Sequence, residues 1–422
     1  MPRFTAGQGC LYAYEEKMKK RFSILQLVTV IVIVAVVTFN LTFTVMNVNH
    51  NKQTSSLLTE SGFLGSLLTV DEIVKQHFPG EVDNDVLKAA VIRGYLEGIG
   101  DKYSTYMTAA EYEEYNSELN GKTVGIGINY IYDTVNKCIE IIEVASGSPA
   151  EAAGILTGDM ILAVDGQRVS DIGYYAAIDM INGESGTTVS LTLLRNGEEQ
   201  EVSSLRTPLE VITVKYHVFS GDSSVGVIRI SAFYSKTPKE VKAAVETLKG
   251  LGCTKFIFDV RYNGGGEKNS IVNTLDYILP EGKLLDVVYK GSAGTKTYRS
   301  DESHLDAKVA ILINNSTASA AELFAAALRD FTDAGKFDAT LVGTTTYGKG
   351  VFQTIFELSD GSAFKVSCGR YDPPSGVNYD GIGVEPDVFA ELSEESKKIN
   401  FYKLTDENDD QLILAASILS SK

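Results

Sequence analysis

The sequence predicts an α/β fold that carries a separate glycine-rich β region and follows one long apolar segment. Positions 23–46 contain no charged residue and are rich in Val, Ile, Leu and Phe. From 124 to about 207, short alternating segments are separated by glycines, a pattern typical of a small β domain. From 208 onward, apolar strand candidates alternate with helical patterns, which indicates an α/β unit with a buried sheet.

The apolar segment is long enough to cross a membrane, since a spanning helix needs about 20 residues. The basic residues within 17–21 predict a cytoplasmic tail at 1–22 and export of everything after 46. A cleaved signal peptide is the alternative, although the segment is long for one and lacks a small-x-small cleavage site. We expect a single-pass signal anchor in the cell membrane, with the rest of the chain extracytoplasmic.

Composition narrows the classes of partner. A formal net charge of −17 argues against nucleic acid. The four cysteines have no repeated close spacing, which argues against a zinc site or a disulfide framework, so we expect no metal and no other cofactor. Cys138, Cys253 and Cys368 would be exported, and an odd number leaves at least one thiol unpaired.

Between the apolar segment and the β region, we expect a linker followed by helices. Positions 47–66 are polar and rich in small residues. Within 67–122, apolar residues recur at helical spacing, with a break at Pro79-Gly80 and an end near Gly98–Asp101. This region is therefore predicted as a pair of helices.

The β region and the α/β unit are predicted from their periodicity. A glycine triplet at 264–266 follows a buried strand candidate. However, neither phosphate-binding motif, Gly-x-x-x-x-Gly-Lys-Ser/Thr or Gly-x-Gly-x-x-Gly, is present, so a nucleotide site is not expected. The strand candidates are 139–144, 160–164, 188–194, 225–230, 256–260 and 309–313, and the helix candidates are 174–181, 237–248 and 412–419.

The stretch 314–353 carries the candidate chemistry. A strand candidate leads through small residues to Ser319 at the start of a helical run. Backbone N–H groups at a helix start favour negative charge, so a hydroxyl there can act as a nucleophile while neighbouring amides hold the oxyanion. An ordinary N-cap serine is the alternative interpretation.

Such a nucleophile needs a base. The four histidines of the chain lie outside this stretch and outside any motif, so a Ser-His-Asp triad has little support. Lysine can serve as the base only if burial keeps it neutral. Lys349 suits this role because Tyr347 and Phe352 lie nearby and the glycines on either side of it allow close packing. A solvated turn lysine is the alternative.

The whole stretch resembles the carboxyl-terminal processing peptidases, which are serine–lysine proteases. Residues 317–322 match the family motif small-Ala-Ser-Ala-small-Glu, and Gly348-Lys349-Gly350 with Gln353 matches the motif after the helix. The resemblance implies Ser319 as the nucleophile, Lys349 as the general base and Gln353 as the residue that orients the lysine. It gives Asp330 a supporting role at the end of the helix.

The resemblance also covers 259–266, which fits the family motif Asp-x-Arg-x-Asn-x-Gly-Gly. It implies that the amide of Gly265 is one oxyanion donor. The second donor is the amide of Ala320 or that of Ser319 itself. Bare glycine suits the first position because a Cβ would crowd the tetrahedral intermediate.

The β region resembles a PDZ domain. Its carboxylate-binding loop is matched by Gly125, Ile126, Gly127 and Ile128, and the second PDZ signature is matched at 148–166. The implied mechanism is β-augmentation, in which loop amides receive the terminal carboxylate of a peptide while its strand pairs with the sheet edge.

Five positions depart from the family pattern. Lys102 stands where a proline is usual in the turn after the second helix, and Gly264 stands where the glycine motif carries proline. Glu267-Lys268 replaces an aliphatic pair and alters the expected lining of the substrate pocket. Asn182 replaces an arginine that the family ties to coupling between the PDZ domain and the active site.

The resemblance therefore implies an α/β protease core, a crotonase-like mixed sheet with helices, into which a PDZ domain, a small β-barrel with helices, is inserted. A transmembrane helix and a helical region precede both. The expected boundaries are a cytoplasmic tail at 1–22, a signal anchor at 23–46, a linker at 47–66, helices at 67–122, the PDZ domain at 123–207, the protease core at 208–392 and a helical extension at 393–422.

The expected function is a membrane-anchored serine endopeptidase that takes protein or peptide substrates with free C-termini. Because region 67–122 often dimerises in the family, a homodimer is a further expectation. A noncatalytic PDZ adaptor that retains the protease fold is the main alternative. A lipid- or retinoid-binding module is a third class, for which the sequence offers no specific feature.

Overall fold

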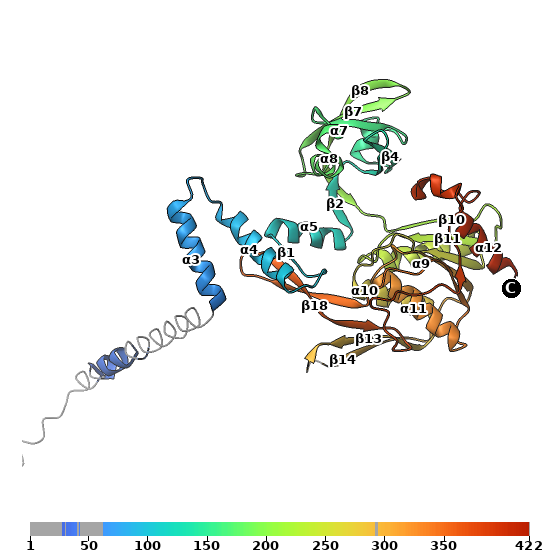
Figure 1. Cartoon of the computed structure of the whole chain (residues 1–422). Helices are drawn as coiled ribbons and strands as arrows, with labels where there is room; N and C mark the ends of the chain where they lie inside the picture. Colours follow the sequence, from blue (N-terminus) through green and yellow to red (C-terminus); the bar gives the residue numbers. More distant parts are fainter. Residues whose placement is uncertain (1–27, 30, 40–41, 43–61, 292–293, 422) are drawn as a thin grey trace, which may run out of the picture. The chain divides into compact units, whose positions relative to one another are not determined.

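The computed structural model describes residues 28–29, 31–39, 42, 62–291 and 294–421 (Figure 1). The chain divides into two compact units, 1–87 and 88–422. Half of the predicted anchor and all of the tail before it lie outside the described residues, so the anchor stays a prediction. Among the residues that the structure does describe, no helix is long and apolar enough to span a bilayer.

Helix α3 (Gly62–His77) is the main described element of the first unit. It begins inside the stretch predicted as a linker, because apolar residues at helical spacing already start at Leu64. The predicted break at Pro79-Gly80 is confirmed, and α4 (Asn84–Gly98) follows it. Helix α3 has no buried residue.

A six-stranded sheet forms the centre of the second unit, in the order β10-β11-β12-β15-β16-β19. The β10–β11 pair is antiparallel and every following pair is parallel, which gives the mixed sheet that was predicted. The strands are β10 (Val214–Val218), β11 (Val225–Ile230), β12 (Lys255–Asp259), β15 (Lys308–Ile313), β16 (Ala339–Gly343) and β19 (Val388–Phe389).

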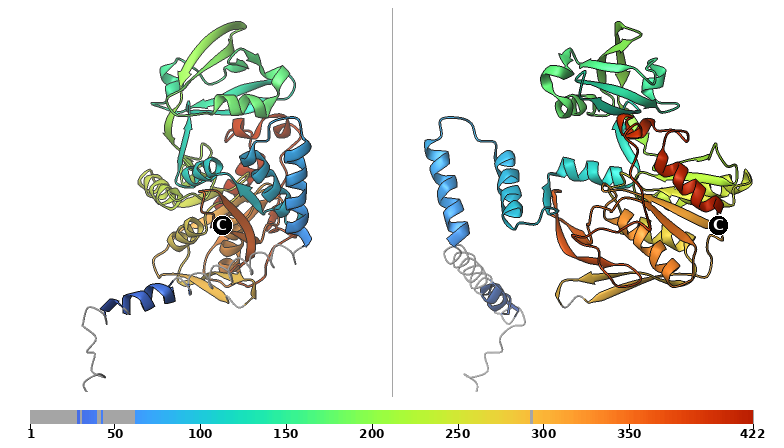
Figure 2. Two further views of the ribbon diagram at one scale, coloured as in Figure 1. Left: turned by 90° about the vertical axis from the view of Figure 1, so that its left-hand side faces the viewer. Right: turned by 45° about the vertical axis from the view of Figure 1, so that its right-hand side comes forward.

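Helices cover both faces of this sheet (Figures 1 and 2). Successive strand residues point to opposite faces, so Ile228 is buried with three of the helices while Val227 is buried with the fourth. The fourth helix lies in the C-terminal extension, which is therefore part of the core. The first three are α9 (Thr237–Gly250), α10 (Lys268–Ile278) and α11 (Ala320–Asp333), and the fourth is α12 (Asp410–Ser421).

The candidate lysine lies in the loop that directly precedes a second sheet. Strands β17 (Val351–Glu357) and β18 (Ala363–Asp372) form a hairpin whose connection contains Asp360-Gly361. The sequence pattern does not predict the other strands of this sheet, in which buried and exposed side chains alternate less regularly. Strand β18 also pairs with β1 (Thr105–Met107) and with β13 (Gly282–Tyr289), which pairs in turn with β14 (Thr295–Ser300).

The PDZ region forms its own sheet and its own core. The sheet has the order β3-β4-β5-β7-β8, and its buried residues form a cluster separate from that of the central sheet. The entry and exit strands of the region pair with each other, as expected of an inserted domain. The elements are β2 (Lys122–Gly125), β3 (Ile128–Asp133), β4 (Cys138–Val144), α6 (Pro149–Ala152), β5 (Met160–Val164), β6 (Gln167–Arg168), α7 (Val169–Ile172), α8 (Tyr174–Ile181), β7 (Thr188–Arg195), β8 (Glu198–Leu205) and β9 (Thr207–Glu210).

Candidate active site

Ser319 lies at the start of α11 in a strained backbone conformation. The Thr317 hydroxyl donates to the Val260 carbonyl at 2.9 Å, which ties the turn between β15 and α11 to the end of β12. Ser319 has φ 58° and ψ −117°, and such a conformation costs a residue other than glycine about 1–3 kcal/mol. Strain that the surrounding structure holds in place is typical of a functional position.

The carboxylate of Glu322 joins the serine turn to the lysine loop. Its side chain is fully buried. One oxygen, Oε2, accepts the backbone N–H groups of both Ser319 and Lys349, each at 2.8 Å. The other, Oε1, accepts the Gly348 N–H and the Thr346 hydroxyl, each at 2.6 Å. The amide nitrogens of Ser319 and Lys349 therefore lie within twice the hydrogen-bond distance of each other.

Glycines allow the lysine loop to pack closely, as the sequence predicts. A Cβ on Gly350 would lie 2.5 Å from the Asn378 side-chain oxygen. A Cβ on Gly348, which has φ 88°, would lie 3.1 Å from the Gly383 amide nitrogen. Both positions therefore require a residue without a side chain.

The Lys349 amine is half-buried and makes no hydrogen bond or ion pair with any described residue. Its nitrogen lies 4.5 Å from the ring centroid of Tyr103, in the turn between α4 and β1. Burial lowers the pKa of this amine, and the positive charge of Lys365 lowers it further, against the carboxylates of Asp101 and Glu322, which raise it. The net lowered pKa is what a lysine acting as a base requires.

The aromatic neighbours of Lys349 differ from those predicted. Phe352 points away into the core, where its ring stacks on Tyr371 at 5.1 Å. Tyr347 is half exposed, and its ring lies 5.0 Å from the Lys102 amine. The ring against Lys349 belongs to Tyr103, because β1 pairs with β18 and brings that turn to the lysine.

The predicted Ser-Lys-Gln set is brought together only in part. No hydrogen bond joins the Ser319 hydroxyl to the Lys349 amine in the described part of the chain. The Gln353 side-chain amide donates to the Ser367 hydroxyl at 3.1 Å, and not to Lys349. The structure thus places the serine and lysine backbones side by side and leaves Gln353 bonded across the hairpin.

The predicted oxyanion residues surround Ser319. A Cβ on Gly265 would lie 2.8 Å from the Ser319 Cβ and 3.0 Å from the Ala320 nitrogen. The Ala320 N–H donates to no described residue, whereas the Ser319 N–H is taken by Glu322. The Gly265 N–H donates to the Asn263 side-chain oxygen at 2.8 Å. An oxyanion would therefore find Ala320 free and would have to displace Asn263 from Gly265.

The remaining residues singled out from the sequence lie around this site. Asp330, for which a supporting role is predicted, accepts the Ser375 N–H at 2.8 Å. Lys102 donates to the Tyr347 hydroxyl at 3.3 Å. Glu267 is half-buried, and burial raises the pKa of its carboxyl. Asn182 is the C-cap of α8 in the PDZ region.

The predicted carboxylate-binding loop connects β2 and β3. Ile126 is buried in the PDZ core, and its carbonyl accepts the Ala150 N–H at 2.8 Å. The N–H groups of Ile126 and Gly127 donate to no described residue, so they can receive a carboxylate. A Cβ on Gly127 would lie 2.3 Å from the Ser148 Cβ, which links this loop to the second PDZ signature.

Two residues at the site have no role in the sequence analysis. Glu322 is the one carboxylate in the apolar run 320–328, and an isolated charge in a buried helix is a signal for a fully bonded side chain. Tyr103 belongs to the same family-type turn as Lys102, but the sequence does not predict its position against Lys349, because that position depends on strand pairing between segments far apart in the chain.

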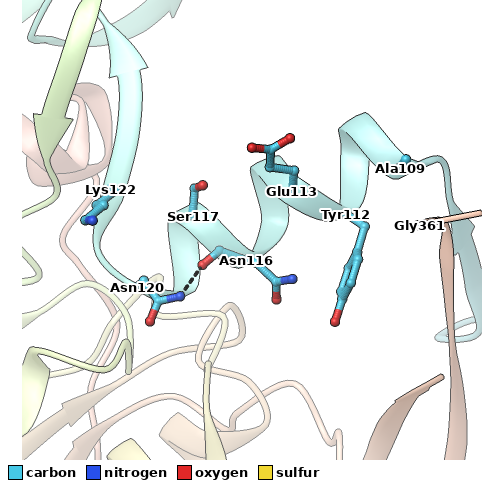
Figure 3. Close-up of a pocket in the computed structure, with 8 residues that line it drawn as sticks. All are labelled: Ala109, Tyr112, Glu113, Asn116, Ser117, Asn120, Lys122 and Gly361. Carbon is cyan, nitrogen blue, oxygen red and sulfur yellow. Dashed lines mark hydrogen bonds between the residues drawn. The ribbon is translucent and has the colours of Figure 1, made fainter. Parts of the chain in front are cut away.

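Among the described residues, no group of three His, Cys, Asp or Glu side chains could hold a metal. Cys138, Cys253 and Cys368 are all free thiols, which includes the unpaired one that the odd number predicts. The pocket in Figure 3 lies along α5 (Ala109–Leu119) and contains none of the candidate catalytic residues.

Two family models match the chain. Residues 224–390 match peptidase family S41, and residues 124–204 match the PDZ domain. The first match includes every candidate catalytic and oxyanion residue. The second match includes all but the ends of the predicted PDZ region.

Curated relatives and a solved structure agree with these matches. The carboxy-terminal processing protease CtpA of Bacillus subtilis is 30% identical over 88% of this chain and 78% of the relative. A CtpA-like serine protease of Staphylococcus aureus is 32% identical over 78% of this chain, which spans 65% of that relative's length. The structure of an S41 protease from Bacteroides fragilis is 17% identical with a TM-score of 0.55, over 83% of this chain and 97% of that one, and supports the fold alone.

Proposed function

The chain belongs to peptidase family S41, and on that premise we propose that it is a membrane-anchored serine endopeptidase whose PDZ domain captures the C-termini of its substrates. The family membership rests on the B. subtilis relative and the S41 match. The single observation that carries the catalytic part is that the backbone N–H groups of Ser319 and Lys349 both donate to the same Glu322 oxygen.

In the proposed reaction, Ser319 attacks the scissile carbonyl and Lys349 takes its proton. The lowered pKa of Lys349 favours the neutral amine that this step needs. The oxyanion is held by the free Ala320 amide and by the Gly265 amide. Because a charged oxygen is a stronger acceptor than an amide oxygen, it can displace the Asn263 side chain from Gly265. Water then hydrolyses the acyl-enzyme.

We also propose that Gln353 orients Lys349, although its side-chain amide is hydrogen-bonded to Ser367 in the structure. For Gln353 to orient Lys349, this bond has to be exchanged when the lysine turns towards Ser319. The hydrogen bond joins two neutral groups, so its net contribution is only about 1 kcal/mol.

The first test compares catalytic variants with matched controls. Ser319→Ala and Lys349→Ala should each lose cleavage of an unfolded protein by at least about 10³-fold while keeping the wild-type thermal unfolding midpoint. Ser316→Ala, in the same turn, and Lys336→Ala, on the surface, should cleave like wild type. Cut sites and rates are measured by mass spectrometry.

Labelling by a fluorophosphonate probe separates the alternative function. Wild type should be labelled at Ser319 and Ser319→Ala should not. A wild-type chain that binds C-terminal peptides but is neither labelled nor proteolytic would be the noncatalytic PDZ adaptor. Substantial proteolysis by pure Lys349→Ala protein would contradict the serine–lysine mechanism.

The membrane anchor is proposed from segment 23–46 and the basic residues before it. The full-length chain should stay in the membrane pellet after alkaline carbonate extraction, and a chain lacking 1–46 should be released. Protease added outside intact cells should digest the PDZ and protease regions. Release of the full-length chain by carbonate would argue against the anchor.

The homodimer also stays a prediction. Helix α3 has no buried residue, and Leu68, Val70 and Ile73 on it are more than half exposed. Exposed apolar residues grouped on one helix often mark a contact with a partner. Analytical ultracentrifugation of the exported part tests whether it sediments as a dimer.

A further inference from the structure

Four residues near the end of the chain converge on the glycine turn beside Ser319. We call Phe401, Tyr402, Asp409 and Gln411 the C-terminal clamp. All four lie beyond residue 390, where the S41 match ends. They contact the pair Arg261-Tyr262, which directly precedes the turn Asn263–Gly265.

The polar half of the clamp binds the guanidinium of Arg261, which is 3% exposed. The guanidinium donates to both carboxylate oxygens of Asp409, at 3.0 and 2.6 Å, and to the Gln411 side-chain oxygen at 2.8 Å. On its other side it donates to both oxygens of Asp259, at 2.9 and 2.8 Å. Arg261 is thus held between two buried carboxylates by two bidentate pairs.

This arrangement fixes the orientation of the Arg261 side chain more than it stabilises the fold. A buried ion pair is weak evidence for stability, because desolvation of the charges offsets much of their attraction. A bidentate arginine–carboxylate pair, however, specifies the plane and the angle of the guanidinium. The clamp therefore determines where the backbone of Arg261 lies.

The aromatic half of the clamp holds the next residue. The ring of Tyr262 lies 4.4 Å from that of Phe401 and 6.3 Å from that of Tyr402. Phe401 also lies 4.8 Å from the Arg261 guanidinium. Tyr262 has φ 61°, an unfavourable conformation for an aromatic residue that persists only where contacts hold it.

The turn Asn263–Gly265 links the position of Arg261 and Tyr262 to that of the nucleophile Ser319. The Asn263 carbonyl accepts the Ala318 N–H at 2.9 Å, and the Asn263 side chain donates to the Ile230 carbonyl at 2.8 Å. Gly265 lies so close to Ser319 that even a methyl group would not fit between them. A small displacement of the turn therefore displaces the amides that surround Ser319.

We propose that the C-terminal clamp positions the turn Asn263–Gly265 against Ser319, with Asp409 and Phe401 as positioning residues for catalysis. The proposal rests on the proposed function, because it assigns the clamp to the same reaction. Neither residue touches the substrate. They act through Arg261 and Tyr262 on the geometry in which the oxyanion is bound.

The test uses the full-length protein and two variants that loosen the clamp by different routes. Asp409 also caps α12 by accepting the Leu412 N–H at 3.1 Å. Asp409→Asn keeps an N-cap residue but loses the charged bidentate pair. Phe401→Leu keeps an apolar side chain but removes the ring under Tyr262.

Both variants should lower kcat by about tenfold or more, since a displacement of about 1 Å can cost 10²-fold. KM should change less than about twofold, because substrate binding is not touched. Labelling of Ser319 by a fluorophosphonate should slow in parallel. The pH midpoint of activity should not move, because Lys349 keeps its surroundings.

A matched control separates positioning from stability. Leu419→Ala opens a cavity between α12 and the sheet, where Leu419 is 3% exposed, and touches neither Arg261 nor Tyr262. Assayed below its unfolding midpoint, this variant should keep the wild-type kcat. Equal kcat in Asp409→Asn, Phe401→Leu and wild type would overturn the proposal, as would an equal loss in Leu419→Ala.

Amide hydrogen exchange tests the same proposal without activity. Peptides covering 261–266 should exchange faster in Asp409→Asn and Phe401→Leu than in wild type and Leu419→Ala. Unchanged exchange there would overturn the proposal. A wild-type chain that is neither labelled by the fluorophosphonate nor able to cleave protein would contradict the proposed function. The hydrogen-exchange result would still decide whether the clamp holds the turn.

Discussion

Glu322 shows how a single buried side chain can determine the geometry of a site. Its two oxygens accept four hydrogen bonds, from the serine turn and from the lysine loop. A carboxylate this deeply buried is tolerated only when its charge is fully bonded. Those bonds leave its oxygens no capacity for the Lys349 amine, which stays available for the proposed role as a base.

The charge of Lys365 is expected to tune that base. Burial is the larger cause of the lowered pKa of Lys349, and the Lys365 charge adds to it. Lys365→Met removes a positive neighbour, so the pKa of Lys349 should rise. Because the proposed mechanism needs the neutral amine, the rising limb of the pH–rate profile should move to higher pH.

The comparison is made on kcat/KM across neutral to alkaline pH. Lys249→Met, an exposed lysine at the end of α9, should leave the profile unchanged. A shift to lower pH in Lys365→Met would contradict the electrostatic argument.

The lowered pKa of Lys349 also affects folding. It makes the unfolded chain bind more protons than the folded one, so the stability that Lys349 contributes is lost as pH falls through its folded pKa.

At the scale of elements, a buried arginine from another segment caps the end of the PDZ helix α8. Arg206 is 7% exposed and donates to the carbonyls of Ile181 and Met180, at 2.9 and 2.5 Å, and to the Thr187 hydroxyl at 2.8 Å. The last carbonyls of a helix have no partner within it, and a cation is favoured at that end. Arg206, which directly follows β8, thus ties the end of that strand to the end of α8 at Asn182.

Arg206→Met should destabilise the PDZ domain by about 3 kcal/mol, because it leaves buried carbonyls without a donor. Arg168→Met is the matched control. Arg168 pairs with Glu199 at 3.1 Å on the surface, with both side chains about half exposed, so its loss should cost at most about 1 kcal/mol. Urea unfolding followed by hydrogen exchange of PDZ peptides measures both. Equal stability of the two variants would contradict the capping role.

At the scale of the whole molecule, the sequence predicts elements better than their partners. The strand at 225–230 and the helix at 174–181 coincide with β11 and α8, because each is encoded by local periodicity. The site residues Ser319 and Lys349 came from a motif resemblance and remain a proposal for catalysis. Tyr103 and Asp409 could not be predicted, since their contacts join segments more than a hundred residues apart.

Helix α12 gives a prediction at this scale. Ala415 is fully buried against the sheet, whereas Ile413 on the same helix is 39% exposed. Ala415→Glu places an unpaired charge in the core and should cost more than about 4 kcal/mol, with loss of soluble protein. Ile413→Glu should be within about 0.5 kcal/mol of wild type. Soluble yield and the thermal midpoint report both, and a stable Ala415→Glu protein would show that α12 does not complete the core.

The position of α12 has a consequence for biosynthesis. A ribosome makes β11, β12, β15 and β16 before it makes 410–421, so one face of their sheet has no cover until that helix emerges. Asp409, which holds Arg261, arrives with the helix. Under the proposed function, the turn beside Ser319 therefore reaches its clamped geometry only after 410–421 has been made, which would limit digestion of the unfolded chain before that point.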